Sequence, residues 1–288
     1  MFDEGGKKGI LYLCATPIGN LKDISLRVID TLREADLIAC EDTRNSIKLL
    51  NHFGISKPLT SYHEHNKYDK AKELALKLHE GKNIALITDA GTPGISDPGE
   101  VIARMCREEG ITVTSLPGPC AAITALSASG MPSRRFCFEG FLSSDKKERE
   151  RVLSELKNDT RTIILYEAPH HLLKTLKELY EALGDRRLTL CRELTKIHEE
   201  FISLSLREAV KLYEEKAPRG EYVLILEGKD PVKLKEEQTE DFKNLSIKEH
   251  VGYYEAMGHD SKESMKLAAK DRGVSKRDIY NALVRGEE

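Results

Sequence analysis

Short apolar runs alternate with helix-length amphipathic segments along most of this chain, and the alternation limits the folds it can adopt. The first part predicts strands at 10–14, 36–40, 84–88 and 111–116, and helices near 24–34, 44–53, 69–80 and 98–109. Gly81 and Gly110 stand where helix C-caps belong, each shortly before the next strand. This order is typical of an α/β fold with a largely parallel sheet.

A second set of elements follows the Pro-Gly-Pro at 117–119. Strands are expected near 135–141, 161–166, 187–192, 200–204 and 221–227, and helices near 120–129, 145–157, 170–183 and 206–216. Polar and apolar residues alternate from Glu200 to Leu206, as in a strand with one solvent-facing side, so this half is expected to be mixed or antiparallel. We therefore expect two α/β domains, over 1–117 and 118–228.

The chain changes character after residue 228. Residues 229–245 are charged and weakly apolar, which favours a linker. Three capping-box spacings then predict three short helices over 246–288, namely Ser246 with Glu249, Asp260 with Glu263, and Ser275 with Asp278. Such a unit resembles a helix-turn-helix bundle with 275–284 as recognition helix. Seven basic and three acidic residues lie between Lys262 and Arg285, so nucleic-acid contact and a docking bundle with a solvated charged face both stay open.

Composition excludes several classes of protein. Lys plus Arg number 45 against 48 Asp plus Glu, a net charge of -3, so no global field indicates a nucleic-acid or acidic-lipid partner. The six cysteines are scattered without a C-x-x-C, which argues against a zinc site or a disulfide framework. No signal peptide or membrane-spanning run is visible. We expect a cytoplasmic protein without membrane association.

The loop from Thr88 to Gly99 has the composition of a ligand-binding turn. Its glycines permit positive φ and close approach, and its prolines stiffen the path. Asp89 and Asp97 suit hydroxyl or ammonium groups better than phosphate. Turns with Pro and Gly also follow the strands that end near residues 14 and 116, and the carboxyl ends of parallel strands converge on one crevice. The nucleotide-binding spacings G-x-G-x-x-G and G-x-x-x-x-G-K-[ST] are missing from these turns.

Further polar residues follow other strands. Glu41 and Asp42 are equally suited to capping the next helix and to catalysis. His63 and His65 flank Glu64 and would share one strand face, which suggests a metal, although a polar substrate-facing loop is favoured because a third ligand is not evident. Arg192 is suited either to a salt bridge with Glu193 or to contact with a phosphate.

Taken in order, seven motifs resemble one family, the tetrapyrrole methylase-like, class III S-adenosylmethionine-dependent methyltransferases, and within it the branch that acts on ribosomal RNA. These motifs are A-T-P-I-G-N-L-x-D-I at 15–24, C-E-D-T-R at 40–44, T-D-A-G-T-P-G-I-S-D-P-G at 88–99, L-P-G-P at 116–119, E-G-F-L at 139–142, Y-E-A-P-H at 166–170 and R-G-E at 219–221. The resemblance implies a cofactor cleft between two α/β domains and a homodimer. It also implies 2'-O-methylation of a cytidine in the decoding region of 16S rRNA, within the small ribosomal subunit.

The resemblance also assigns residues. It implies that S-adenosylmethionine is bound by Pro17, Asp89, Thr92, Gly94, Ile95, Ser96, Cys120, Ala121, Glu167, Ala168, Gly220, Glu221 and Tyr222. Methyl transfer needs in-line positioning and a base for the hydroxyl proton, and it requires no metal. The catalytic candidates are the carboxylates, for proton removal, and the arginines, for RNA phosphate or for raising hydroxyl acidity: Glu41, Asp42, Glu64, Arg44 and Arg192.

Two alternative functions remain at this point. One is a methyltransferase of a tetrapyrrole or another small substrate with the same cofactor cleft. The other is a non-enzymatic RNA-binding scaffold whose glycine loops only pack.

Overall fold

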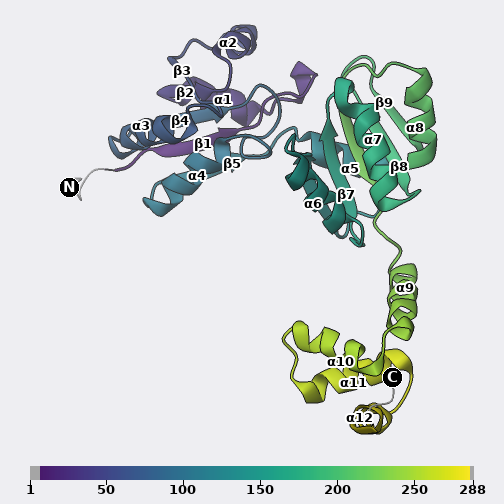
Figure 1. Ribbon diagram of the computed structural model, residues 1–288. Coiled ribbons are helices and arrows are strands. Elements are labelled where there is room, and N and C mark those ends of the chain that lie inside the picture. The colour runs from purple at the N-terminus through teal and green to yellow at the C-terminus, as the bar shows by residue number, and fades with distance from the viewer. Residues whose placement is uncertain (1–6, 286–288) are drawn as a thin grey trace. The chain divides into compact units, whose positions relative to one another are not determined.

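The computed structural model describes residues 7–285, apart from the side chains of residues 238–239, 241 and 243–244. Within that range the chain forms two compact units (Figure 1). One unit runs to Leu156 and resumes over Arg161–Glu227; the other contains Lys157–Thr160 and the chain from Gly228 onward. None of the helices in the described part combines the length and apolar character needed to span a bilayer.

The first sheet is parallel throughout, with strand order β3-β2-β4-β1-β5. Its strands are β1 (Ile10–Cys14), β2 (Leu37–Cys40), β3 (Leu59–Ser61), β4 (Ile84–Ile87) and β5 (Thr112–Leu116). The short helix η1 (Leu21–Asp23) precedes the helices α1 (Leu26–Glu34), α2 (Thr43–His52), α3 (Lys67–His79) and α4 (Gly99–Glu108). The predicted elements are confirmed, with β3 as a short addition.

Both faces of this sheet are covered, as parallel sheets require. Every residue of β4 is buried, and its side chains alternate between two cores. Ile84 and Leu86 pack with α3 and α4, whereas Ala85 and Ile87 pack with α1 and α2. Gly81 and Gly110 follow α3 and α4 with φ of +88° and +65°, which confirms their predicted role in ending these helices.

The second sheet is mixed, as the alternation over 200–206 predicts, with order β6-β7-β10-β8-β9. Only β6 and β7 pair in parallel. The strands are β6 (Phe136–Phe141), β7 (Thr162–Glu167), β8 (Arg187–Arg192), β9 (Glu200–Ser205) and β10 (Tyr222–Leu226), and the helices are α5 (Ala121–Ser129), α6 (Lys146–Leu156), α7 (Pro169–Leu183) and α8 (Leu206–Glu215).

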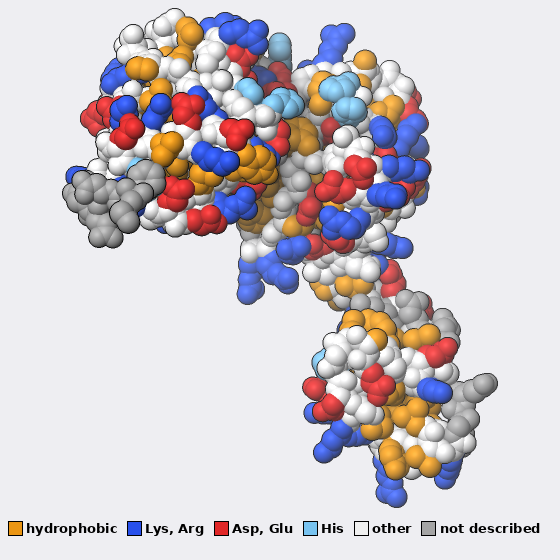
Figure 2. Space-filling view, turned by 60° about the vertical axis from the view of Figure 1, so that its left-hand side comes forward, with side chains coloured by type: hydrophobic (Ala, Val, Ile, Leu, Met, Phe, Trp, Pro, Cys, Tyr) orange, Lys and Arg blue, Asp and Glu red, His pale blue; other side chains and the backbone are white. Residues whose placement is uncertain are grey.

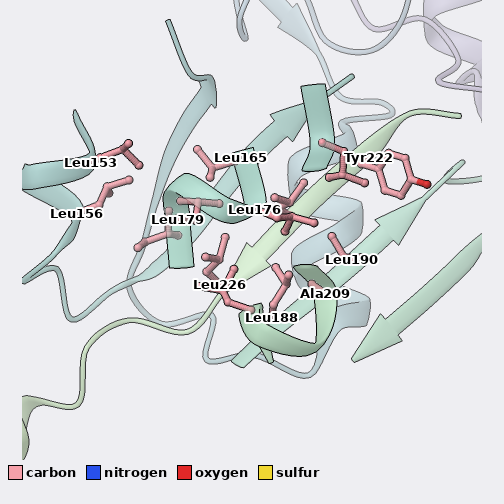
Figure 3. Packing of buried hydrophobic residues seen from close by; sticks show 14 of the residues in the cluster. Leu153, Leu156, Leu165, Leu176, Leu179, Leu188, Leu190, Ala209, Tyr222 and Leu226 are labelled. Carbon is pink, nitrogen blue, oxygen red and sulfur yellow. The ribbon is translucent and has the colours of Figure 1, made fainter. Parts of the chain in front are cut away.

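A leucine-rich core fixes the second sheet against α6, α7 and α8. Figure 3 shows Leu176 and Leu179 of α7 directed toward Leu188 of β8 and Leu226 of β10. All four are fully buried. Helix α5 covers the opposite face, where Ala125 meets Ile164 and Val223. The sheet is therefore held from both sides, which makes its strand ends firm supports for a site.

The second unit is helical. It consists of α9 (Pro231–Asn244), α10 (Ile247–Ala256), α11 (Ser261–Arg272) and α12 (Lys276–Arg285). Most of the segment interpreted as a linker is thus the helix α9. The three helices predicted beyond it are confirmed: Ser246 and Glu249 form a capping box, Asp260 accepts from the Glu263 amide, and Gly273 ends α11 with φ of +66°.

Candidate functional site

The polar residues that follow β2, β3 and β4 lie at one edge of the first sheet. Cys40 is paired with Ser61 on one side and with Ile87 on the other. This register brings Glu41, His63 and Asp89 to neighbouring strand ends. The turn after β1 joins them because Thr16 and Gly91 exchange two backbone hydrogen bonds, of 2.9 and 3.1 Å.

A cavity of about 370 Å³ opens at this edge, a volume typical of small-molecule sites. Residues 7–119, around the first sheet, contribute one wall, and residues 120–227, around the second sheet, contribute the other. These two parts of the first unit are called the first and the second domain below. Its lining comprises Ile18, Glu41, Thr88, Ala90, Gly91, Thr92, Ile95, Ser96, Asp97, Cys120, Ala121, Phe141, Tyr166, Glu167, Ala168, Pro169, Cys191, Leu194, Glu221, Tyr222 and Val223.

Asp97 organises the loop that forms the first wall. Its carboxylate accepts hydrogen bonds from the amides of Gly94, Ile95 and Gly99, at 2.8 to 3.1 Å. Ser96 has φ of +66°, a left-handed conformation that costs free energy for a residue with a side chain. The loop is thus held in a strained shape by one carboxylate.

The second domain approaches this loop closely at Gly140. A register shift between Phe138 and Gly140 marks a β-bulge in β6, where Gly140 has φ of +61°. A Cβ at residue 140 would lie 2.9 Å from Ser96 Oγ. Only glycine allows both this backbone conformation and this contact.

The second wall is mostly apolar. The Tyr166 hydroxyl accepts a hydrogen bond from the Ala122 amide at 3.0 Å, and its ring contacts those of Phe138 and Phe141 edge-on, with centroids 5.0 and 5.5 Å apart. The Glu167 carboxylate is buried, accepting from the Thr175 hydroxyl and the Ala168 amide. Apart from Glu167 and Glu221, the side chains of this wall are uncharged and mostly apolar.

The charged side chains that line the described cavity all carry carboxylates. They are Glu41, Asp97, Glu167 and Glu221, and no lysine or arginine is among the lining residues. An electrostatic field of this sign favours a cationic ligand.

Nine predicted cofactor residues line the cavity: Thr92, Ile95, Ser96, Cys120, Ala121, Glu167, Ala168, Glu221 and Tyr222. Pro17, Asp89, Gly94 and Gly220 are not lining residues. Asp89 instead accepts from the Asp42 amide and the Asn45 side chain, which ties the loop to the start of α2. Gly220, with φ of +80°, passes Glu193 so closely that a Cβ would lie 2.5 Å from its Cγ.

Among the catalytic candidates, Glu41 alone lines this cavity. Partial burial, followed by the negative charges of Asp89 and Asp97, raises the pKa of Glu41 above its ordinary value. A carboxylate of raised pKa is a stronger base than an ordinary one.

Asp42 and Arg44 pair with each other at the start of α2. Asp42 is the N-cap, accepting from the Arg44 amide at 2.8 Å, and Arg44 Nη2 donates to it at 2.7 Å. The Arg44 side-chain and backbone hydrogen bonds lower the pKa of Asp42 to about 2. Of the two roles that the sequence allows for Asp42, capping is the one this geometry shows.

The other candidates lie apart from the cavity lining. Glu64 is exposed and pairs with Lys67 at 2.5 Å. Arg192 donates to the Arg219 carbonyl at 2.7 Å and pairs with Glu200, rather than Glu193, at 3.1 Å. It lines a smaller cavity of about 330 Å³ together with Lys216 and Arg219.

The histidines beside Glu64 show no metal geometry. The rings of His63 and His65 have centroids 6.0 Å apart. Over residues 7–285, no group of three or more His, Cys, Asp or Glu is arranged to hold a metal ion. An electrostatic contribution from His63 lowers the pKa of Glu41, against the larger effect of burial, which raises it.

The apolar lining is what sequence reasoning missed. Tyr166, Cys191 and Val223 lie at or near the ends of buried strands, where their apolar character indicates only a core. Tyr166 belongs to a motif quoted above, and its place beside Glu167 is the one signal that would have suggested it.

The family model for tetrapyrrole (corrin/porphyrin) methylases matches residues 10–210. The relative "Ribosomal RNA small subunit methyltransferase I" of Halalkalibacterium halodurans is 50% identical over 97% of this chain and 96% of its own length. The Bacillus subtilis protein of the same name is 47% identical over 98% and 96%. The one from Thermotoga maritima is 46% identical over 77% of this chain and 100% of its own length.

Two solved structures share the fold. Diphthine synthase superposes with a TM-score of 0.60 at 14% identity, covering 77% of this chain and 90% of its own. Uroporphyrin-III-C-methyltransferase from Thermus thermophilus has a TM-score of 0.54 at 19% identity, covering 76% and 94%. The resemblance inferred from the motifs is thereby confirmed: this chain belongs to the tetrapyrrole (corrin/porphyrin) methylase family, in the group whose curated members are named ribosomal RNA small subunit methyltransferase I.

Proposed function

We propose that this chain is a ribosomal RNA methyltransferase that uses S-adenosylmethionine to methylate the ribose 2'-oxygen of a cytidine in the decoding region of 16S rRNA. The observation that carries the proposal is the acidic cavity between two α/β domains, in a chain whose relatives along almost its whole length bear an rRNA methyltransferase name. The cytidine and the 2'-oxygen rest on the motif resemblance.

The lining suits S-adenosylmethionine in charge and in shape. The cofactor carries a sulfonium and an ammonium group, and the charged side chains around the cavity are carboxylates. Its adenine ring is flat and has two apolar faces. The wall that contains Tyr166 and Val223 offers such a ring mostly apolar side chains to pack against. When bound, S-adenosylmethionine supplies an electrophilic methyl group for in-line attack by a hydroxyl oxygen.

Glu41 is the proposed proton acceptor. It combines a place on the cavity lining with a raised pKa, so its carboxylate would take the hydroxyl proton as the new oxygen–carbon bond forms. Asp42 is a weaker base because its pKa is lowered. Arg44, whose side chain is 86% exposed, and Arg192 are proposed to meet RNA phosphates, and Glu64 remains an alternative base.

The deciding experiment follows the methyl group. Labelled S-adenosylmethionine is incubated with the protein and with purified small ribosomal subunits, naked 16S rRNA, or a tetrapyrrole acceptor. We expect label in rRNA, at a cytidine whose neighbouring phosphodiester resists alkaline hydrolysis. Label only in the tetrapyrrole would establish the small-substrate alternative.

A calorimetric titration with S-adenosylmethionine separates the enzyme from a scaffold. We expect saturable heat with one site per chain. A titration without saturable heat would favour the alternative of a non-enzymatic RNA-binding scaffold. The motif resemblance also implies the assembled small subunit as substrate and a homodimer, and the composition favours a cytoplasmic setting. The dimer is tested by sedimentation of the purified chain.

A further inference from the structure

Three lysines form a stripe along α11. Lys262, Lys266 and Lys270 are four residues apart, so they share one face of the helix, and all three are exposed. Within the described residues, none of them is held in an ion pair. Figure 2 shows Lys and Arg side chains projecting from this helical unit beside exposed apolar groups.

Charged helices of the first unit are built differently. On α3, Lys70 and Lys77 both pair with Glu73, and on α7 Lys174 pairs with Glu178. On α11, by contrast, Lys262, Lys266 and Lys270 follow one another at four-residue spacing, so each has a lysine rather than a glutamate as its neighbour at that spacing. Like charges at this spacing destabilise a helix, so the stripe is not explained by the stability of α11.

The acidic residues nearby form no ion pair with these lysines in the described part of the chain, and each of them has another contact inside the unit. Glu263 lies 3.6 Å from His259, Asp271 accepts from the Tyr254 hydroxyl, and Asp278 accepts from the Ser275 amide and hydroxyl. Lys262, Lys266 and Lys270 are therefore left to solvent, whereas Arg272 at the end of α11 donates to the Phe242 and Leu245 carbonyls.

Helix α12 of the same unit also carries exposed side chains. Arg277 is exposed, and so are Tyr280 and Val284, with 55% and 68% of their surface in solvent. These positions share one face, opposite the side on which Ile279 and Ala282 are buried. An exposed aromatic ring in the same unit as unpaired lysines suits nucleic acid, since aromatic rings stack on bases while cations meet phosphates.

We propose that the face formed by Lys262, Lys266 and Lys270 of α11 with Arg277 and Tyr280 of α12 binds the sugar-phosphate backbone of ribosomal RNA. The inference rests on the proposed function, because it takes rRNA as the substrate. This face holds the substrate and takes no part in methyl transfer.

The test removes the lysines stepwise in the full-length chain, as Lys266→Gln, Lys262→Gln/Lys266→Gln, and the triple variant with Lys270→Gln. Affinity for naked 16S rRNA is measured as a function of salt. We expect the slope of log affinity against log salt to fall by about 0.7 to 0.9 for each lysine. The triple variant should raise KM for RNA by about tenfold or more, with kcat unchanged.

Lys248→Gln is the matched control, because Lys248 is an exposed lysine on α10 of the same unit. It should leave the slope unchanged. Cofactor affinity by calorimetry should be unchanged in every variant. The melting temperature should not fall, since glutamine is nearly as good a helix former as lysine and the substitutions remove like-charge repulsion along α11. A Tyr280→Ser variant should weaken binding without changing the slope.

The outcomes separate the two proposals. A wild-type chain that methylates rRNA, with a triple variant of unchanged slope and KM, would overturn the RNA face and leave the proposed function intact. A wild-type chain that methylates no RNA overturns the proposed function, while the slopes still decide whether this face binds RNA. Weakened binding to small subunits with unchanged binding to naked rRNA would show that the face recognises protein.

Discussion

The two walls of the cavity are built on opposite principles. The wall from the first domain is polar and irregular: Asp97 holds a loop with a strained serine, and Glu41 stands on a neighbouring strand end. The wall from the second domain consists of side chains such as Tyr166 and Val223, set on strands buried from both sides.

This difference suggests that the first wall supplies the group that removes a proton and the second wall supplies most of the cofactor affinity. A general base must be able to reach the proton that it removes, whereas a flat ring is held best by a rigid apolar surface. Changes on the polar wall should therefore alter rate or loop order, and changes on the apolar wall should alter binding alone.

The largest effect is expected from Glu41→Gln. The amide keeps the shape but cannot accept the hydroxyl proton, so methyl transfer at saturating cofactor should fall by about 10² to 10⁴-fold. Cofactor affinity by calorimetry should stay close to that of the wild type. Asp42→Asn is the control, with a smaller loss because Asp42 is paired with Arg44 outside the lining. A fully active Glu41→Gln enzyme would exclude Glu41 as the base.

Asp97→Ala should have the next largest effect, and it should act on binding. Three backbone amides lose their acceptor, and each unpaired donor costs about 1 to 3 kcal/mol if it stays out of water. We expect the loop to rearrange and cofactor affinity to fall by about tenfold or more. Glu100→Ala, an exposed neighbour on α4, is the control. Unchanged affinity in Asp97→Ala would show that the loop keeps its shape without the carboxylate.

Tyr166→Phe should produce a smaller change on the apolar wall. It removes the hydroxyl that accepts from the Ala122 amide and keeps the ring. A lost hydrogen bond of this kind costs about 0.5 to 1.5 kcal/mol, so cofactor affinity should weaken a few-fold while the rate at saturation is maintained. A fall in kcat with constant affinity would contradict the separation of the two walls.

The smallest effect concerns stability. Because the pKa of Glu41 is raised in the folded chain, the stability linked to this group is present in acid and is lost as pH rises from the ordinary glutamate pKa through the raised value. The Glu41→Gln variant has no carboxyl group at this position, so its stability does not fall for this reason as pH rises. Its melting temperature relative to wild type should therefore be higher near neutral pH than in mild acid, as scanning calorimetry can measure. A difference that is independent of pH would show that the Glu41 pKa is ordinary.

The regular elements were predictable because apolar runs and glycines recur at strand and helix ends. The strand β3 was missed because it has three residues and Leu59 is its one large apolar side chain. This strand matters because it carries His63 to the strand end next to the one that Glu41 follows.

The site was predictable in part. Glycine, proline and aspartate mark the loop at 88–99 in any context, whereas a buried tyrosine or valine of the second wall resembles every other core residue. Glu41 and Asp42 are neighbours of the same chemistry, and only the direction in which the chain leaves β2 makes one line the cavity and the other cap a helix. That direction depends on packing across the whole sheet.

The bulge at Gly140 has a consequence for how this fold tolerates change. A methyl group at residue 140 would meet the Ser96 hydroxyl, and the left-handed backbone there is strained for any residue with a side chain. An alanine at this position would therefore act on the cavity indirectly, by turning the Ser96 hydroxyl or by changing the bulge in β6. Residue 140 is not a lining residue, so a scan of lining residues would overlook it.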